Sequence, residues 1–403
     1  MNLLKHQTEA ENHLNEWKVG ALFMEPGTGK TRVSVDIVNK SPCDGVFWIG
    51  PLQTIRPKDG IPSVKDEVTK WGGFNIPAEY YGIESIQGSD RIYFEMWDKI
   101  KAFKNPFIVI DESLKIKNAE AKRTKRLLDI SKEVEYKLIL NGTPLSRNLL
   151  DIWSQMEFLS PLILNMTLNQ FKNTFCRITT VTKKIGFYKH SIEYITGYEN
   201  IDYLYSLIRH YVFECDLHLN VKQKYDTVYY DLSEEERERY KELKEYYLNL
   251  ETLEWKRNQI FIEMTQAMQH SYCCAEDKFI QLSRLFDTIP EEQTIIFCKF
   301  IKSAHECKER YPKATVLSYQ KEAYGLNMQH LCHTVYFDKV FNYADRIQSG
   351  RRTFRTGQEY DCHYYDMTGD VGLEKIIDRN INKKEDMIEY LKKISVKQLE
   401  QIL

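Results

Sequence analysis

A short segment near the amino terminus limits the fold more than any other part of the sequence. The apolar run at residues 20–24 (GALFM) is followed by EPGTGKT at residues 25–31 and then by a helical pattern. A strand, a glycine-rich turn and a helix in this order are typical of a phosphate-binding loop, although Met24 stands where the general pattern G-x-x-x-x-G-K-[ST] has its first glycine. The segment predicts an α/β fold that binds a nucleotide.

The residues of this loop suit the phosphates of ATP. Glycines let backbone N–H groups approach phosphate oxygens, and the start of a helix adds a favourable dipole. We expect Lys30 to reach the β- and γ-phosphates and the hydroxyl of Thr31 to hold Mg²⁺, with Gly27, Thr28 and Gly29 forming the rest of the phosphate site. The alternative is a glycine-rich turn without a ligand.

A second motif follows in the order and at the distance that an ATPase requires. The apolar run FIVI ends in Asp111 and Glu112. Ligands of parallel sheets lie at the carboxyl ends of the strands, so Asp111 is a candidate magnesium ligand and Glu112 a candidate base for the attacking water. An Asp-Glu pair after one strand is a weak signal alone, but its place after GTGKT makes it strong.

Composition argues against other classes of protein. The nine cysteines form no C-x-x-C pair, the ten histidines are scattered, and no H-E-x-x-H or G-x-S-x-G motif occurs, so neither zinc nor a serine nucleophile is indicated. We expect reduced thiols and structural or surface histidines, with His6 a possible exception. No long apolar run and no signal-peptide layout is present, which predicts a cytoplasmic protein without a membrane partner.

The order of patterns predicts two α/β lobes separated by a mainly helical insertion. Residues 1–160 alternate apolar runs with helical patterns and should form the first lobe. Within the insertion, residues 161–275, a β-hairpin is expected at 177–198, followed by a short helix at 202–212 (DYLYSLIRHYV). Residues 233–272 are expected to be long helices or a solvated helical hairpin. Residues 276–403 should form the second, smaller lobe with a helical tail.

The sequence resembles the helicase-like ATPases of superfamily two, and within them the Swi/Snf branch of DNA translocases. LLKHQTEA looks like the motif that reads adenine, which implies that Gln7 contacts the base. EPGTGKT resembles a loop of this branch that also lacks the first glycine, and DESLKIKN resembles its D-E-A-H-R-I-K-N. The most specific match is LNGTPLSRNLLDIWSQMEFLSP, where Gly142, Thr143 and Pro144 would couple the ATP state to the grip on nucleic acid. The resemblance implies two RecA-like lobes.

The second lobe carries the remaining motifs of the branch. TIIFCKF resembles motif IV and YGLNMQHLCHTVYFD motif V, which places Gly325 at the nucleotide. FNYADRIQSGRRTFRTGQ resembles motif VI and implies a nucleotide contact for Gln348. Arg352 and Arg355, three residues apart, would share one helix face and act as arginine fingers on the γ-phosphoryl group. Surface arginines or simple phosphate contacts are the alternative.

The sequence departs from the family at three places. The interval between motif IV and Gly325 is short, which predicts an abbreviated second lobe. Lys321-Glu322-Ala323 stands where the branch has A-G-G. Leu114 replaces the histidine of D-E-A-H, which removes one polar link between the nucleotide and the second lobe. We therefore expect ATP hydrolysis with an unusual grip on DNA. The segment at 169–208 resembles the fork-remodelling or annealing-helicase side of the branch and small phage-encoded relatives.

Basic charge gathers around these motifs although the whole chain has a net charge of −2. Residues 299–358 hold eleven Lys and Arg against five Asp and Glu, and residues 113–147 hold nine against four. Such concentration suits a phosphate backbone, whereas ordinary solvated lysines are the alternative. The candidate nucleic-acid contacts are Lys115, Lys117, Asn118, Thr143, Arg147 and Lys299. The hairpin and the helices at 233–272 are candidates for touching a duplex or a fork, or serve only as packing.

These observations predict a DNA-dependent ATPase that uses ATP and Mg²⁺. It would move along or remodel duplex or branched DNA without sequence preference, as a monomer, with replication or recombination proteins as possible partners. One alternative is an ATP-switched nucleic-acid-binding protein that does not translocate. Another is an RNA helicase, which fits the lobes but not the stretch from Asn141 to Pro161.

Overall fold

The structure is a computed structural model that describes most of the chain. The described residues are 3–57, 62–142, 149–185, 188–217, 219–249, 257–319, 328–341, 343–355 and 357–382; among them, the side chains at 180–194, 196, 257–262, 343, 344, 348 and 382 are not described. The chain divides into two compact units, Met1–Leu217 (unit 1) and His218–Leu403 (unit 2). In the described part, no helix is long and apolar enough to cross a membrane.

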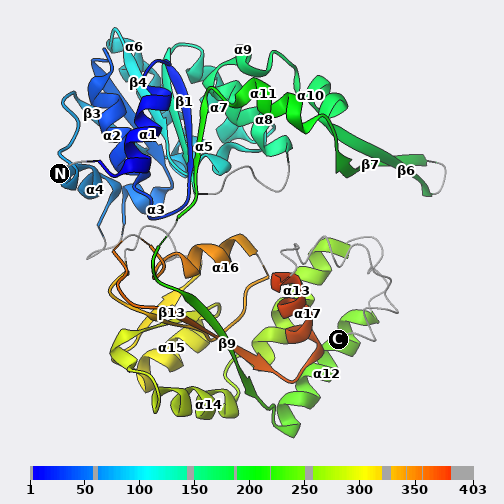
Figure 1. Cartoon of the computed structure of the whole chain (residues 1–403). Coiled ribbons are helices and arrows are strands. Elements are labelled where there is room, and N and C mark those ends of the chain that lie inside the picture. Colours follow the sequence, from blue (N-terminus) through cyan, green and yellow to red (C-terminus); the bar gives the residue numbers. More distant parts are fainter. Residues whose placement is uncertain are drawn as a thin grey trace. The chain divides into compact units, whose positions relative to one another are not determined.

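Unit 1 is built on a six-stranded parallel sheet with the order β3-β2-β4-β5-β1-β8 (Figure 1). Its strands are short apolar runs without polar alternation, as expected where both faces of a sheet are covered. The strands are β1 (Val19–Met24), β2 (Gly45–Gly50), β3 (Ala78–Gly82), β4 (Pro106–Ile110), β5 (Tyr136–Asn141) and β8 (Val212–Cys215).

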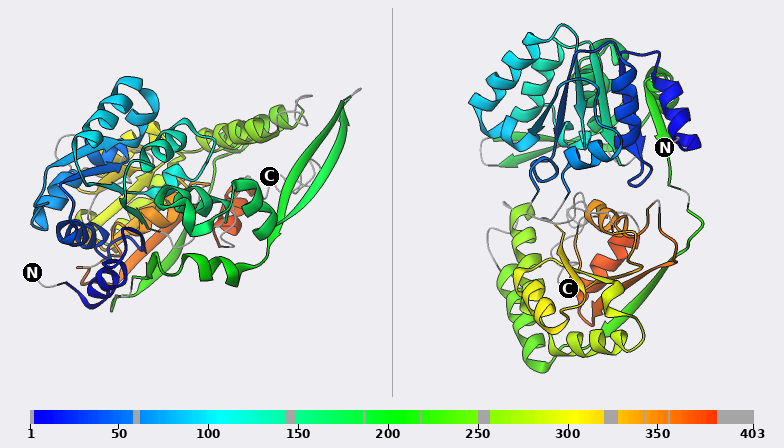
Figure 2. Two further views of the ribbon diagram at one scale, coloured as in Figure 1. Left: turned by 90° about the horizontal axis from the view of Figure 1, so that it is seen from above. Right: turned by 90° about the vertical axis from the view of Figure 1, so that its left-hand side faces the viewer.

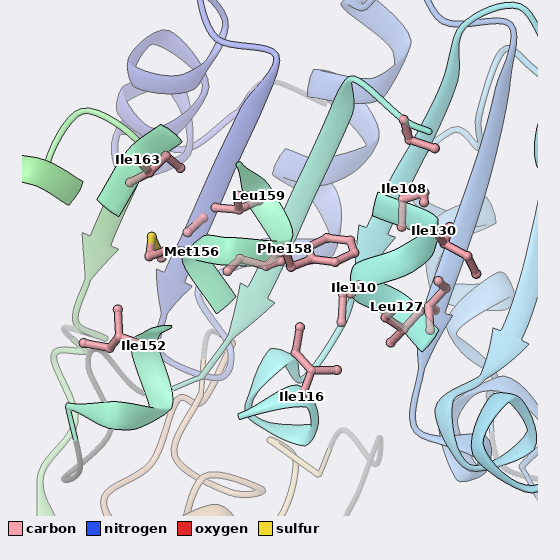
Figure 3. Packing of buried hydrophobic residues seen from close by; sticks show 14 of the residues in the cluster. Ile108, Ile110, Ile116, Leu127, Ile130, Ile152, Met156, Phe158, Leu159 and Ile163 are labelled. Atoms are coloured by element: carbon pink, nitrogen blue, oxygen red, sulfur yellow. The ribbon is translucent and has the colours of Figure 1, made fainter. Parts of the chain in front are cut away.

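Helices cover both faces of this sheet (Figure 1). Successive residues of a strand point to opposite faces, so Leu22 and Leu138 pack with α1, α2 and α4, whereas Phe23 and Ile139 pack with the helices from α5 onward. Figure 3 shows part of the second cluster, in which Ile110 of β4 lies near Leu127 of α7. The helices are α1 (Lys5–Leu14), α2 (Lys30–Lys40), α3 (Leu52–Ile55), α4 (Val64–Lys70), α5 (Ile83–Gly88), α6 (Asp90–Ala102), the 3-10 helix η1 (Ser113–Ile116), α7 (Lys122–Ser131), α8 (Leu150–Leu159), α9 (Pro161–Leu164), α10 (Leu168–Phe175) and α11 (Ile201–Ile208).

Unit 1 also carries the predicted β-hairpin. Strands β6 (Cys176–Ile185) and β7 (Tyr188–Tyr198) pair antiparallel and form a two-stranded sheet separate from the parallel one. The hairpin follows α10 directly and extends away from the helices of unit 1 (Figures 1 and 2). This part of the prediction is confirmed.

Unit 2 contains a five-stranded parallel sheet with the order β11-β10-β12-β13-β9. Its strands are β9 (Gln223–Tyr230), β10 (Thr294–Cys298), β11 (Thr315–Ser318), β12 (His333–Tyr336) and β13 (Cys362–Gly369). Its helices are α12 (Glu234–Leu248), α13 (Arg257–Ser271), α14 (Glu276–Phe286), the 3-10 helix η2 (Glu291–Gln293), α15 (Ile301–Arg310), α16 (Tyr343–Gly350) and α17 (Gly372–Asn382). The expected capping box opens α12, where Ser233 accepts from the backbone of Glu236.

Two parallel sheets flanked by helices confirm the predicted fold class, but the units divide elsewhere than at the expected boundaries 160/161 and 275/276. Strands β8 and β9 both come from the expected insertion, and each joins one of the sheets. The pattern DYLYSLIRHYV predicted a single helix, whereas α11 ends at Ile208 and Val212 begins β8. Residues 161–217 thus belong to unit 1, and α12 and α13 belong to unit 2.

Candidate nucleotide-binding site

The predicted phosphate-binding loop joins β1 to α2 in unit 1. Gly27 and Gly29 have φ angles of 92° and 89°, which L side chains rarely adopt, so both glycines are required by the backbone. A Cβ atom at Gly29 would lie 2.2 Å from Nε2 of Gln7. Lys30 is the first residue of α2, with Gly29 as its N-cap, and Thr31 follows in the first helical turn. The loop therefore presents backbone N–H groups at a helix start, the arrangement that binds phosphate.

Met24 ends β1 and belongs to the core of unit 1. Its side chain is fully buried among residues of α1 and α2, and its backbone is paired with Cys215 of β8. Met24 is absent from the residues with positive φ, so this position does not need glycine. The departure from the general pattern therefore leaves the turn at Gly27 and Gly29 intact.

The loop is held by bonds from its own residues and from α1. Lys30 Nζ donates to the Met24 carbonyl oxygen at 2.8 Å, and Thr28 Oγ1 donates to the Glu25 carbonyl oxygen at 2.7 Å. The carbonyl oxygen of Thr28 accepts from Gln7 Nε2 at 2.9 Å and lies 2.8 Å from Nε2 of His6. Gln7 therefore lies against the loop, and His6 converges on the same oxygen. The contact with the base that the resemblance implies for Gln7 stays a prediction.

Asp111 and Glu112 follow β4 at the carboxyl end of the sheet. Glu112 has φ 54°, a left-handed conformation uncommon outside glycine, and its N–H donates to Asp111 Oδ1 at 3.0 Å. Burial raises the pKa of the Asp111 carboxyl to about 7, and the charges of Glu112 and Glu67 act in the same direction, while Lys30 opposes them. A desolvated carboxylate with further carboxylates nearby is an oxygen donor set that fits Mg²⁺.

The order of the strands brings the two motifs together. Strand β5 lies between β1 and β4, so its carboxyl end stands between the loop and Asp111. Gly142 follows β5, and a Cβ atom there would lie 3.0 Å from Pro26 Cγ and 3.9 Å from Lys30 Nζ. The loop, Gly142 and Asp111 thus share one edge of the sheet. Thr143, Pro144 and Arg147, predicted for the same motif, lie outside the described residues.

Polar side chains of α8, the helix that follows Gly142, contact the segment that follows Asp111 and Glu112. Ser113 Oγ donates to Gln155 Oε1 at 2.6 Å, and both residues are buried. Ser154 Oγ donates to the carbonyl oxygens of Ile116 and Lys117 at 2.7 Å and 2.9 Å. These contacts were not predicted from the sequence, although Ser154 and Gln155 interrupt the apolar residues of α8, a signal that could have indicated them.

The three candidate nucleic-acid contacts of this segment have partners within unit 1. Lys115 Nζ lies 3.5 Å from a carboxylate oxygen of Glu84, and Lys117 Nζ lies 3.3 Å from one of Asp151. The side chain of Lys117 is 53% exposed, and the Asn118 side chain accepts from the N–H of Glu120 in a turn. The Lys115–Glu84 pair is partly exposed and therefore weak, whereas Lys117 pairs with the buried Asp151. Both lysine side chains are accessible enough to meet a phosphate.

The predicted motif VI residues of unit 2 do not share a helix face. Helix α16 ends at Gly350, and Arg352 and Arg355 lie in the turns that follow. The spacing of three implied a common face only if the helix continued, and that prediction is wrong. Arg352 is buried and Arg355 is partly exposed. The side chain of Gln348 and the whole of Gly325 lie outside the described residues.

Lys299, the last candidate for nucleic acid, makes its contacts inside unit 2. Its Nζ donates to Gln269 Oε1 at 2.7 Å and lies 3.7 Å from the ring centre of Phe341. Burial lowers the pKa of Lys299 to about 8, and the charges of Asp338 and Glu374 act against that shift. Through these contacts Lys299 joins α13 to the segment that follows β12.

Comparison with known proteins supplies the family. Residues 83–281 match the family described as "SNF2-related domain". "Helicase domino" of Drosophila melanogaster is 30% identical over 203 residues, which are 43% of this chain and 6% of that protein. "Helicase SWR1" of Mycosarcoma maydis is 31% identical over 163 residues, which are 35% of this chain and 8% of that protein. The chain spans less than a tenth of the length of these two relatives.

One solved structure, "Sulfolobus solfataricus SWI2/SNF2 ATPase core in complex with dsDNA", covers 100% of this chain and 97% of its own, with 16% identity and a TM-score of 0.42.

The fold and the site together define an α/β protein of the P-loop nucleotide-binding class, because two helix-flanked parallel sheets are present and one carries the P-loop and the Asp-Glu pair at one edge. The match to the SNF2-related domain narrows this class. Residues 83–281 carry an SNF2-related domain, and over part of its length the chain is similar to Swi/Snf-type helicases. Its P-loop lies outside the matched residues, so the geometry of unit 1 adds to the match.

Proposed function

We propose that this chain is a DNA-dependent ATPase that translocates along duplex or branched DNA, or remodels it, during replication, recombination or repair. The observation that carries the proposal is the shared edge of the unit 1 sheet, where the P-loop, Gly142 and Asp111 meet within an SNF2-related ATPase. Lys30 and the backbone of Gly27–Thr31 would bind the phosphates. Thr31 and Asp111 would hold Mg²⁺, which would neutralise charge on the transferring phosphoryl group.

Glu112 is proposed as the base that orients and deprotonates the attacking water. Its backbone adopts a left-handed conformation directly after Asp111. Such conformations are common among residues at functional sites. Arg352 and Arg355 of unit 2 are proposed to stabilise charge on the γ-phosphoryl group once both units act on one nucleotide. Alternation between nucleotide-bound and nucleotide-free states would then change the grip on DNA.

The proposal is tested by measuring ATP turnover with duplex DNA, single strands, forks and RNA. Lys30→Ala and Glu112→Gln should each reduce the DNA-stimulated kcat by at least about a hundredfold, the scale of a lost general base or phosphate contact, while Glu112→Gln retains ATP binding. Unchanged turnover in Glu112→Gln would remove its assignment as the base. Stimulation by RNA alone would favour an RNA helicase.

Displacement of the third strand from a DNA triplex separates translocation from a simple ATP switch. A translocase strips the third strand only when ATP is hydrolysed, so Lys30→Ala should leave the triplex intact. DNA-stimulated hydrolysis without displacement would favour the switch, in which ATP changes affinity for DNA without movement.

A further inference from the structure

The chain passes from unit 1 to unit 2 once, between Leu217 and His218. On the unit 2 side, Lys222 is held at the start of β13: its N–H donates to Asp361 Oδ1 at 2.9 Å, and its carbonyl oxygen accepts from the N–H of Cys362 at 2.8 Å. Four residues separate Leu217 from Lys222. The segment that joins the two units is therefore short, and its length depends on whether Leu217 is held as well.

Leu217 is held by the P-loop. Its N–H donates to Glu25 Oε2 at 2.8 Å in a partly buried bond. Glu25 is the first residue after β1, and its own N–H donates to the Cys215 carbonyl oxygen at 2.9 Å. Met24 and Cys215, the last residues of β1 and β8, stand opposite one another in the sheet. The side chain and the backbone of one loop residue therefore fix the end of unit 1.

A single peptide group connects this anchor to Lys30. The peptide group between Met24 and Glu25 accepts from Lys30 Nζ at 2.8 Å through its carbonyl oxygen. Through its N–H it donates to Cys215. A cation on the carbonyl oxygen polarises the peptide group and strengthens the bond that its N–H donates. Lys30 is also expected to bind the β- and γ-phosphates, whose charged oxygens are stronger acceptors for an ammonium group than a neutral carbonyl oxygen is.

Release of Leu217 would lengthen the segment that joins the units. While Leu217 is held, four residues lie between it and Lys222. Once it is released, the last held residue of unit 1 is Cys215, and six residues lie between the held positions. At about 3.5 Å for each extended residue, the two added residues increase the reach of the segment by about 7 Å. The bond between Glu25 and Leu217 therefore limits how far the connection can extend.

We propose that Glu25 is a positioning residue that holds the start of the connection to the P-loop and releases it when phosphate groups take up Lys30. Without the Lys30 bond, the peptide group before Glu25 is less polarised. Both bonds of Glu25, to Cys215 and to Leu217, then weaken because one residue makes them. The inference rests on the proposed function in taking ATP as the ligand of the loop. It adds the residue through which the loop acts on the connection between the units.

Hydrogen–deuterium exchange of the full chain tests the proposal, with mass spectrometry on peptides that contain the Leu217 amide. Without nucleotide or DNA, this amide should exchange at least about tenfold faster in Glu25→Ala than in the unaltered chain, the scale of one lost bond to a charged acceptor. Glu25→Gln keeps an acceptor oxygen and should retain most of the protection. Glu84→Ala is the matched control, because Glu84 Oε2 accepts from the N–H of Leu52 at 2.8 Å elsewhere in unit 1.

Lys30→Met removes the Lys30 bond without any nucleotide. It should speed the exchange of the Leu217 amide about two- to fivefold, the scale on which one hydrogen bond polarises the next. Lys137→Met is its control, because Lys137 Nζ also donates to a backbone carbonyl oxygen in unit 1, that of Ser131. This control should leave the Leu217 amide unchanged. Mg²⁺ with a non-hydrolysable ATP analogue should speed the exchange of the same amide in the unaltered chain.

The sign of the change in nucleotide affinity separates this role of Glu25 from a merely structural one. If the nucleotide weakens the hold on Leu217, loss of that hold must favour the nucleotide, because coupling between two sites is reciprocal. Glu25→Ala should therefore lower the Kd of the ATP analogue about two- to fivefold, whereas damage to the loop would raise it. Glu25→Gln should keep a Kd within about twofold of the unaltered value, since it keeps the bond.

Two results would overturn the proposal, provided that the thermal midpoint shows a retained fold. One is an unchanged exchange of the Leu217 amide in Lys30→Met or with the ATP analogue, which would separate Lys30 from the connection. The other is a raised Kd in Glu25→Ala, which would reduce Glu25 to a structural part of the loop. Because exchange in the variants is measured without turnover or DNA, a chain whose ATPase ignores DNA would fail the proposed function and still give a decisive result for Glu25.

Discussion

Nε2 of Gln7 donates a hydrogen bond to the Thr28 carbonyl oxygen at 2.9 Å, which ties the first turn of α1 to the middle of the P-loop. The other end of the same amide, Gln7 Oε1, accepts from the N–H of Leu4 at 3.0 Å and caps α1. His6 Nε2 lies 2.8 Å from the same Thr28 oxygen. One buried amide therefore fixes both the start of a helix and the conformation of the loop.

Gln7→Ala should raise KM for ATP about five- to fifteenfold, because one hydrogen bond of about 1–1.5 kcal/mol no longer holds the loop in its binding conformation. His6→Ala/Gln7→Ala should raise it further, since the Thr28 carbonyl then loses both partners. Steady-state kinetics at saturating DNA measure the effect. Thr8→Ala is the control, because its hydroxyl bonds to the Leu4 carbonyl and not to the loop. An equal rise in Thr8→Ala would mean that the effect comes from α1 alone.

The raised pKa of Asp111 makes the stability of the nucleotide-free chain depend on pH. The folded chain keeps this proton up to a pH of about 7, whereas the unfolded carboxyl releases it near 3.8. The unfolding free energy should therefore fall as the pH rises between these values and stay low above 7. Asp111→Asn removes this ionisation. The unfolding free energy of the variant should therefore rise above that of the unaltered chain as the pH increases over that interval, by up to about 4 kcal/mol at pH 8.

Thermal midpoints between pH 5 and pH 8.5, with a chelator present, measure this difference. Asp129→Asn is a suitable control, because Asp129 is exposed and paired with Lys132 at the surface. A difference between Asp111→Asn and the unaltered chain that does not change with pH would contradict the pKa. Mg²⁺ with a nucleotide should close the difference, since the proposed ion favours the carboxylate.

The parts of the site that could be read from the sequence are those contiguous in the chain. EPGTGKT and the Asp-Glu pair each follow a strand directly, so a local pattern predicts both the element and the edge at which the residues lie. The roles of Met24, His6 and Glu67 could not be predicted in this way. They follow from how β8, α1 and α4 pack, and no spacing in the sequence encodes those contacts.

Two expectations failed because they extended a local pattern too far. Arg352 and Arg355 were placed on one helix, but α16 stops at Gly350, a residue type that favours helix ends because it tolerates other backbone conformations. The helix predicted around residues 202–212 gives way to β8, a strand of four residues that is too short to show any alternation. Both errors concern where a helix ends. This depends on the tertiary contacts of the residues that follow, such as the pairing of β8 with β1.

Lys299 and Lys117 are both predicted to contact nucleic acid, but Lys299 is partly buried among partners in unit 2 whereas the side chain of Lys117 is largely exposed. Lys299→Ala removes a hydrogen bond to Gln269 and the packing on Phe341, so it should lower the unfolding free energy by about 1–3 kcal/mol without changing the salt dependence of DNA binding. Lys117→Ala removes an ion pair in which the lysine side chain is 53% exposed and that of Asp151 12%. It should reduce the slope of log affinity against log salt by about 0.9 if it meets a phosphate. A changed slope in Lys299→Ala would restore it as a DNA contact.

The bond between Ser113 and Gln155 offers the sharpest test of communication within unit 1. Ser113 follows the Asp-Glu pair and Gln155 lies on α8, and their buried side chains are joined at 2.6 Å. Ser113→Ala should cost about 1–3 kcal/mol of stability, since Gln155 Oε1 loses its donor in the core. Gln155→Met should cost a similar amount, and the double variant should cost less than the sum, with a coupling energy above about 0.5 kcal/mol.

If this bond also transmits the nucleotide state to α8, both single variants should lose DNA stimulation of ATP hydrolysis while KM for ATP in the absence of DNA stays the same. Ser131→Ala is the matched control, because Ser131 is also buried in unit 1 but donates to Leu128 within its own helix. Ser131→Ala should change stability without changing the ratio of stimulated to basal turnover. Additive stabilities together with unchanged stimulation would reduce the Ser113–Gln155 bond to a packing contact, because coupling between two sites requires an interaction that the two variants share.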